Sequence, residues 1–162
     1  MLHPMIEETP WFDDVALPAL LRGARATYRS AIRAALSEAG CDDVPRNGSF
    51  VVGAIARTGS PLAEIIKELG VSKQAAGQLV DTLVLRGYLD RAPDNEDRRR
   101  MTVTLTERGS LAASAVRAAV DRVDAELTAR VGIEHVAHTR ATLGALIVAN
   151  HAHEPGVDDG GE

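Results

Sequence analysis

The stretch "SPLAEIIKELGVSKQAAGQLVDTLVLRGYLDRAPDNEDRRRMTVTLTERG", residues 60–109, decides the fold of this 162-residue chain. Its first part predicts a short helix. Ser60 is a good N-cap residue, and Pro61 occupies the first helical position, where a missing N–H is not needed. Gly70 can end this helix in a left-handed conformation. After a tight turn, Ser72 offers a second N-cap, so a second helix follows closely.

The second helix carries one apolar stripe and ends at Gly87. Its apolar side chains recur at intervals of three and four residues, which is the spacing of a helix that buries one face. They are Ala76, Leu79, Val80, Leu83 and Val84. The opposite face is polar.

Residues 88–105 predict a β-hairpin. Met101, Val103 and Leu105 alternate with two threonines, as in a half-buried strand. The loop before them holds four acidic or amide residues and then three consecutive arginines. A solvated, salt-bridged turn is the ordinary explanation of such a charge run, and a nucleic-acid contact is the alternative.

Further helices flank this region. We expect a long helix over residues 15–38, a shorter one over 48–57, a third long helix capped by Thr106 and ended by Gly132, and a last helix over 133–150. In the last helix Val136, Leu143, Leu146 and Ile147 are expected to face inward. The end of the chain, residues 153–162, is acidic and expected to be disordered.

The composition favours a single soluble domain of helical type. Hydrophobic residues make up 45% of the chain, but none of its apolar runs approaches the roughly 20 residues of a membrane span. No signal peptide is visible, and a single cysteine excludes an internal disulfide and a cysteine-based zinc cluster. We therefore expect a cytoplasmic protein without membrane contact, and neither cofactor nor metal is expected.

The charge is divided unevenly along the chain. The net charge is −5, yet residues 1–14 and 154–162 contain eight acidic residues and no lysine or arginine. The remaining residues carry 18 basic and 15 acidic side chains. An overall acidic protein can therefore still offer a basic face to a polyanion.

Two helices joined by a tight turn, followed by a hairpin, form the layout of a winged helix-turn-helix. The second helix of such a unit enters the major groove of DNA with its first turns. The residues expected to face DNA there are Ser72, Lys73, Gln74, Ala75, Gly77 and Gln78. Glutamine can bond the edge of adenine, lysine can reach guanine or a phosphate, and the small residues permit close approach.

The hairpin tip is expected to reach the minor groove, whose negative potential attracts arginine. Arg98, Arg99 and Arg100 stand at this tip. Asp97, two residues before Arg99, has a suitable position to hydrogen-bond that arginine and hold it extended.

Residues 62–109 resemble the core of the MarR family of bacterial transcription regulators. Asp97, Arg99, Leu105, Thr106 and Gly109 stand in register with the family's wing signature. The segment from Gly87 to Arg91 resembles the strand that follows the family's recognition helix, which adds Arg91 to the expected DNA contacts. The resemblance implies a homodimer that spans a pseudo-palindromic operator and releases DNA when a small, often aromatic or phenolic, effector binds.

The expected fold is thus mainly α, with a two-stranded wing and long terminal dimerisation helices. We assign residues 1–45 to an N-terminal arm and dimerisation helix, 46–109 to the DNA-binding lobe, and 110–152 to C-terminal dimerisation helices. The favoured function is a sequence-specific regulator, a repressor released by an effector, with no enzyme activity and no catalytic residue. A winged-helix module that binds protein and not DNA is the alternative. A zinc enzyme built on the histidines has little support.

Weaker features have ordinary explanations. Cys41 can be an incidental thiol or a redox sensor, and the neighbouring Asp42 and Asp43 oppose a thiolate. His135 and His138 lie one turn apart, but nothing nearby completes a metal site. Tyr28 and Phe50 are candidate effector contacts because aromatic residues are rare here, although core packing explains them equally well. An arginine stripe at residues 22, 25, 29 and 33 can face an anion or extend over the dimer helices.

Overall fold

A computed structural model of the chain describes residues 11–58, 71–93 and 101–151. The described part is mainly helical, with one two-stranded antiparallel sheet, as the sequence predicts. The chain divides into two compact units, Met1–Asp121 and Arg122–Glu162. The assignment of residues 1–45 and 110–152 to dimerisation stays a prediction.

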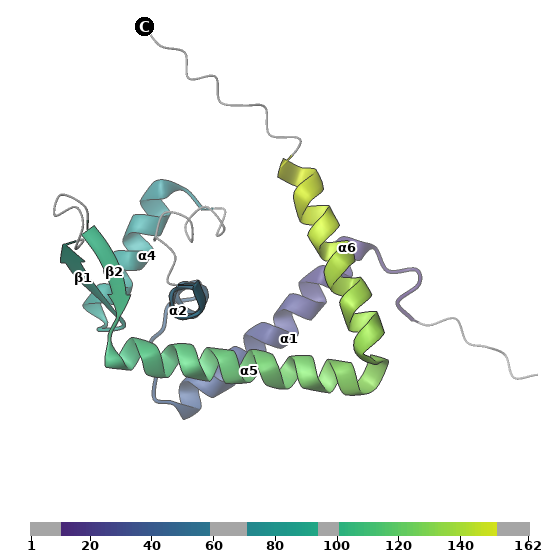
Figure 1. Cartoon of the computed structure of the whole chain (residues 1–162), viewed down its shortest axis with the longest axis horizontal. Coiled ribbons are helices and arrows are strands. Elements are labelled where there is room, and N and C mark those ends of the chain that lie inside the picture. The colour runs from purple at the N-terminus through teal and green to yellow at the C-terminus, as the bar shows by residue number, and fades with distance from the viewer. Residues whose placement is uncertain (1–10, 59–70, 94–100, 152–162) are drawn as a thin grey trace, which may run out of the picture. The chain divides into compact units, whose positions relative to one another are not determined.

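The order of elements follows the predicted one (Figure 1). The elements are α1 (Leu17–Glu38), α2 (Gly48–Thr58), α4 (Lys73–Leu85), β1 (Leu89–Pro93), β2 (Met101–Leu105), α5 (Glu107–Val131) and α6 (Ile133–His151). Helix α1 begins slightly later than expected because Pro18 lies in its first turn, where it favours a helix start. The helix predicted after Ser60 and the acidic end, 153–162, lie outside the described residues.

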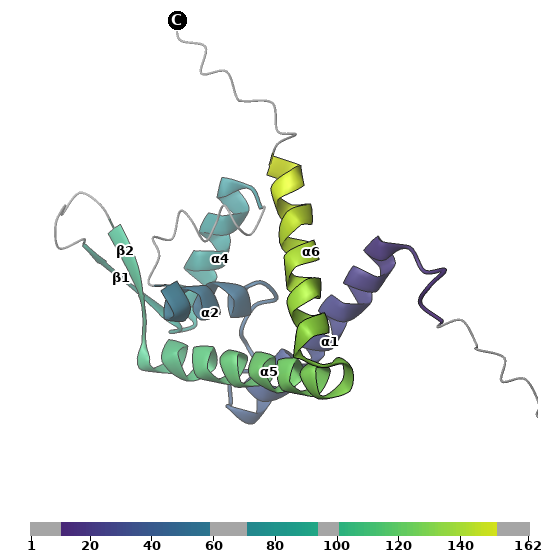
Figure 2. The same ribbon diagram turned by 45° about the vertical axis from the view of Figure 1, so that its right-hand side comes forward.

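The core of the first unit forms around α2. Figure 2 shows α2 between α4 and the first half of α5. Val52 of α2 and Leu83 of α4 are fully buried. Gly53 of α2 faces Val116 of α5, since an added Cβ would lie 3.5 Å from the Val116 Cγ1 atom. The core also includes Leu36, Cys41, Val51, Ala54, Val80, Tyr88, Leu89, Ala112 and Ala113.

Helix α4 has the boundaries and the buried face that its sequence predicts. The Ser72 hydroxyl accepts a hydrogen bond from the Ala75 backbone N–H at 3.2 Å, which caps the first turn. Ala76, Val80 and Leu83 are buried. Gly87 follows the helix with φ at 72°, a left-handed conformation that glycine adopts without strain and that turns the chain into β1.

The start of α5 is fixed to the turn between α4 and β1. The Thr106 hydroxyl lies 2.6 Å from the Gly87 carbonyl and accepts from the Gly109 N–H at 2.9 Å. The Thr106 N–H also donates to the Tyr88 carbonyl at 3.2 Å. A Cβ on Gly109 would lie only 2.0 Å from that carbonyl oxygen, so only glycine fits there. The Leu-Thr and Gly of the predicted signature thus join three elements.

The second unit contains the end of α5 and α6. Arg140 of α6 pairs with Asp124 of α5 at 2.7 Å, and Val136 is buried. Leu146 and Ile147, which were expected to face inward, are 49% and 60% exposed. The expectation fails for the single chain because α6 is long and has too little of its own unit to pack against. None of the described helices has the length and apolar character needed to cross a membrane.

Candidate nucleic-acid interface

Helix α4 presents a polar surface opposite its buried stripe. Lys73, Gln74, Ala75 and Gln78 are exposed, and Ser72 before them is exposed as well. Because one face is held by the core, the first two turns are rigidly displayed. Side chains that donate and accept hydrogen bonds therefore stand together on one convex helical surface, which suits the edges of base pairs in a major groove.

Gly77 interrupts this surface without any structural need. A Cβ added there would meet nothing within 4 Å, and the residue has ordinary helical φ. Glycine inside a helix costs about 1 kcal/mol of stability relative to alanine. The fold therefore does not require Gly77, and no side chain stands at this position on the polar surface of α4.

Arg91 of β1 lies against α4. Its Nη2 atom is 2.5 Å from the Oδ1 atom of Asp81, which stands one turn after Gln78 on the exposed side of the helix. The arginine side chain is still 43% exposed. The ion pair therefore holds Arg91 beside the polar surface. The positive charge of Arg91 also neutralises the negative charge of Asp81, which would repel phosphates. The sequence did not indicate this role for Asp81.

The two strands of the hairpin form the base of the wing. Strands β1 and β2 pair antiparallel, with Leu89 opposite Leu105 and Pro93 opposite Met101. Asp97, Arg98, Arg99 and Arg100 belong to the segment between the strands and lie outside the described residues. Their predicted contact with the minor groove stays a prediction.

A cluster of polar side chains joins the segment before α2 to the residues that lead into the hairpin. The Tyr88 hydroxyl donates to the Asp43 carboxylate, and Arg108 donates to the same carboxylate at 2.9 Å and to the Arg86 carbonyl at 2.6 Å. Arg86 in turn donates to the Asp43 carbonyl. The Arg108 guanidinium also stacks 4.4 Å from the centre of the Tyr88 ring. The loop before α2 is thereby fastened to the end of α4 and to the start of α5.

Charge and burial in this cluster shift two pKa values. The hydrogen bond from Tyr88, aided by the charge of Arg108, lowers the pKa of Asp43. Burial, together with the hydrogen bond to Asp43, raises the pKa of Tyr88. Asp43 is therefore a carboxylate and Tyr88 a phenol across the ordinary pH range, which is the pairing that the hydrogen bond needs.

The remaining sequence candidates lie elsewhere. Tyr28 is half-buried and Phe50 is 42% exposed, and neither lines the hollow formed by Ala26, Arg29, Ser30, Arg33 and Arg46. Cys41 is buried, and its thiol lies 3.6 Å from the Ala39 carbonyl. His135 and His138 are exposed on α6, and no group of three or more metal-ligating side chains occurs among residues 11–58, 71–93 and 101–151.

Comparison with known sequences identifies the region around this surface. The sequence model of the MarR family matches residues 42–100, from the loop before α2 to the hairpin tip. No curated protein matches the chain significantly.

Solved structures with the same fold cover most of the chain. The structure of S. aureus MepR in complex with DNA is 18% identical, has a TM-score of 0.68 and covers 85% of this chain and 98% of its own. The transcription regulator MarR of Oenococcus oeni PSU-1 is 16% identical, with a TM-score of 0.65 and coverage of 82% and 98%. The transcriptional repressor CouR, bound to a 23-mer DNA duplex, is 20% identical, with a TM-score of 0.63 and coverage of 82% and 92%.

At these identities the structural likeness establishes the fold, and the family model adds the sequence pattern of the lobe that carries α4 and β1. The chain therefore has the winged helix-turn-helix fold of these regulators, and its residues 42–100 match the sequence model of the MarR family.

Proposed function

We propose that this protein is a sequence-specific DNA-binding regulator of transcription that acts as a homodimer. The observation that carries the proposal is the exposed start of α4, where Lys73, Gln74 and Gln78 stand on a helix fixed by its buried face. Two of the structures with this fold, MepR and CouR, contain DNA. Base reading by the start of α4 requires no catalysis.

The two halves of the DNA contact have different tasks. Gln74 and Gln78 are placed to read base edges in the major groove, whereas Lys73 and the N–H groups around Ser72 suit phosphate oxygens. Arg98, Arg99 and Arg100 of the wing add contacts in the neighbouring minor groove. Phosphate contacts give affinity and salt dependence, and the glutamines give sequence preference.

A homodimer is supported by apolar side chains that the single chain leaves exposed. In the second unit these are Leu127, Val131, Ile133, Leu146, Ile147 and Val148. Exposed apolar residues gathered on helices mark contact surfaces, and a two-fold dimer buries the same surface on both copies. A dimer of this kind places two copies of α4 on half-sites about one helical turn apart, so the operator is a pseudo-palindrome.

We further propose that the protein is a repressor and that a small effector releases it from DNA. This part follows from the resemblance to MarR regulators. Tyr28 and Phe50 remain the proposed aromatic contacts for such a molecule. A reporter gene under the selected operator, measured with and without the protein, gives the sign of regulation.

Selection of binding sites from a random duplex library tests the proposal directly. The purified protein should enrich a two-fold related sequence and bind it in the nanomolar range, with an affinity that falls steeply as salt rises. Gln74→Ala should relax the preference at one base position of each half-site, while Lys73→Ala should weaken all duplexes alike. Gln74→Ala with an unchanged preference at every position would contradict the assignment of this side chain.

The same experiment distinguishes the proposed DNA-binding function from the alternative, binding to another protein. A winged-helix module that binds only protein enriches no sequence and shows no duplex affinity even at low ionic strength. That result would overturn the proposed function while leaving the fold intact.

A further inference from the structure

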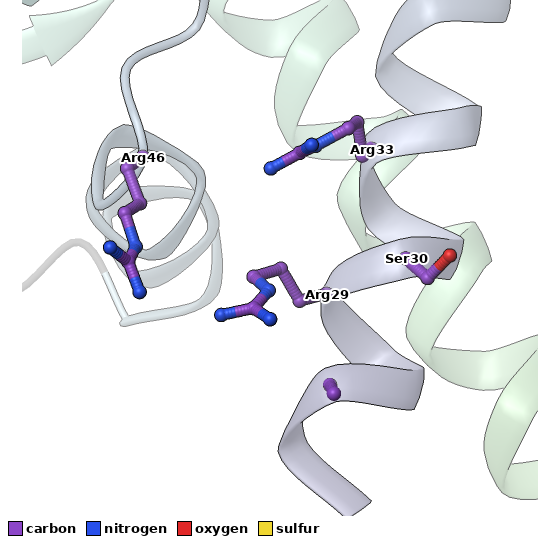
Figure 3. A pocket seen from close by; sticks show the side chains of 5 residues that line it. Arg29, Ser30, Arg33 and Arg46 are labelled. Atoms are coloured by element: carbon purple, nitrogen blue, oxygen red, sulfur yellow. The ribbon is translucent and has the colours of Figure 1, made fainter. Parts of the chain in front are cut away.

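A hollow between α1 and the segment before α2 gathers arginine side chains. It has a volume of about 470 Å³ and is lined by Ala26, Arg29, Ser30, Arg33 and Arg46. Below it is called the arginine hollow. Arg29 and Arg33 stand one turn apart on α1, and Arg46 precedes α2 by two residues. In Figure 3 the two α1 arginines extend toward the side of the hollow that carries Arg46, whereas the Ser30 hydroxyl points away from them.

What sets these three guanidinium groups apart is that they line one hollow, since ion pairs with aspartate are made by only some of the described arginines. Arg91, Arg108, Arg117 and Arg140 each pair with an aspartate. Arg29, Arg33 and Arg46 take part in none of the ion pairs and side-chain hydrogen bonds found among residues 11–58, 71–93 and 101–151. Each guanidinium carries five N–H donors and no acceptor; at these exposed positions water accepts the hydrogen bonds, and an anion can take the place of that water.

The sequence around the hollow adds to the positive charge. No acidic residue occurs between Asp14 and Glu38, while Arg25, Arg29 and Arg33 follow one another at intervals of four residues on α1. Like charges at this spacing disfavour a helix. The arrangement therefore costs helix stability in the absence of a counter-charge, and a bound anion would relieve it.

We propose that the arginine hollow binds a small polyanion that carries two or more carboxylate or phosphate groups. The planar fork of arginine matches both groups with two parallel hydrogen bonds. Three such forks that face one concave volume can hold a molecule with several acidic groups, and the volume is in the range of small-molecule sites. Concavity favours a small molecule over a DNA backbone, which needs an extended surface.

The inference adds an anionic ligand to the proposed effector response, at a place that Tyr28 and Phe50 do not line. It rests on the proposed function only for the expectation that the bound polyanion alters DNA affinity. Binding of the polyanion itself is measured without DNA. A protein that binds the polyanion and ignores all duplexes would sink the proposed function alone, and the reverse result would sink this inference alone.

Isothermal titration calorimetry of the full-length protein at constant ionic strength provides the test, with citrate, inorganic pyrophosphate and acetate as probes. At least one of the two polyanions should bind, and acetate should not. Arg29→Gln, Arg33→Gln and Arg46→Gln should each raise the dissociation constant about tenfold, because each removes a charge-assisted hydrogen bond. A preference for citrate or for pyrophosphate then distinguishes a polycarboxylate from a phosphate ester.

Two control variants sharpen the result. Arg22→Gln removes an exposed arginine of the same helix that does not line the hollow, and it should leave binding unchanged. Arg33→Lys keeps the charge and loses the fork, so it should fall between the wild type and Arg33→Gln.

Three outcomes would overturn the inference. The first is the absence of binding for both polyanions. The second is an equal loss for Arg22→Gln, which indicates unspecific attraction. The third is that the glutamine variants lower the salt dependence of DNA binding, or change the oligomeric state in analytical ultracentrifugation, without affecting polyanion binding. In that case the arginines contact phosphates of DNA or a second copy of the chain.

Discussion

At the scale of single residues, two glycines illustrate opposite reasons for lacking a side chain. Gly109 is demanded by the protein, because an added Cβ would lie 2.0 Å from the Tyr88 carbonyl oxygen. Gly77 is not demanded by the protein, because an added Cβ would meet nothing within 4 Å. The first glycine therefore serves the fold, and the second is free to serve whatever α4 contacts.

Gly77→Ala should raise stability and lower DNA affinity. Alanine is the better helix former by up to about 1 kcal/mol, and the new methyl group fits the free protein without conflict. On DNA the methyl group would meet the closely approaching groove. Thermal unfolding and fluorescence anisotropy with the selected operator measure the two effects.

Gly23→Ala is the matched control for this variant. Gly23 lies inside α1 and also has no atom within 4 Å of an added Cβ, so alanine should stabilise the protein there without changing DNA affinity. If Gly77→Ala binds the operator as tightly as the wild type, Gly77 does not lie against the groove.

Gly109→Ala should destabilise the protein. The Cβ cannot be accommodated unless the backbone of Tyr88 moves, and forcing extra atoms into a packed site costs roughly 1–3 kcal/mol. Urea unfolding measures the loss. Gly53→Ala serves as a control, because its Cβ would make only ordinary contact with Val116, and its cost should be clearly smaller. Equal unfolding midpoints for the two variants would show that the close approach at Gly109 is relaxed in solution.

The sequence predicted well those residues whose role depends on their neighbours in the chain. Ser72 as N-cap, Thr106 as cap of α5 and Gly87 as helix end were all visible because capping and left-handed ends involve residues within one turn. The partners of Asp43 were not predictable, since Arg108 lies 65 residues away and only the finished fold brings the two together.

At the scale of elements, the hairpin and α4 depend on the polar cluster around Asp43. Asp43 belongs to the loop before α2, Tyr88 to the end of the turn after α4, and Arg108 to α5. For the described elements the predicted order of helices and strands was confirmed, because periodicity and turn residues define each element locally. The contacts that hold these elements together are made by side chains such as Asp43 and Arg108, which no periodic pattern predicts.

Asp43→Asn should make the protein less stable at neutral pH and less sensitive to acid. The pKa of Asp43 is lowered in the folded state, so its contribution is present above the ordinary carboxyl pKa of about 4 and disappears as the pH falls through the lower folded value. Unfolding midpoints of wild type and variant should therefore differ at pH 7 and converge toward pH 3. Asp42→Asn, at the exposed residue before Asp43, is the control and should leave the pH dependence of the unfolding midpoint unchanged. A difference between the two unfolding midpoints that stays constant with pH would show that the ionised carboxylate of Asp43 does not cause it.

At the scale of the whole molecule, α6 leaves several apolar side chains exposed, on which the proposed homodimer rests. Leu146 and Ile147 fit the predicted apolar pattern, yet they are not covered within the chain. The expectation that they face inward is wrong for the single chain, because periodicity does not distinguish a core residue from one that contacts another subunit.

Ile147→Glu should convert the proposed dimer into monomers and thereby weaken operator binding. A carboxylate in an apolar interface loses its hydration without gaining a partner. Sedimentation velocity gives the oligomeric state. His138→Glu adds the same charge to α6 nine residues earlier, on the opposite side of the helix, and should leave the assembly intact. A wild-type protein that sediments as a monomer at micromolar concentration would refute the dimer.

The attachment of Thr106 and Gly109 to the backbone at Gly87 and Tyr88 has a mechanical consequence. The N-terminal end of α5 therefore contacts the backbone at the C-terminal end of α4 directly, without an intervening side chain. We therefore expect a change in the tilt of α5 to be passed on to α4. If the proposed function holds, loosening this attachment should uncouple the effector response from DNA binding while each persists on its own.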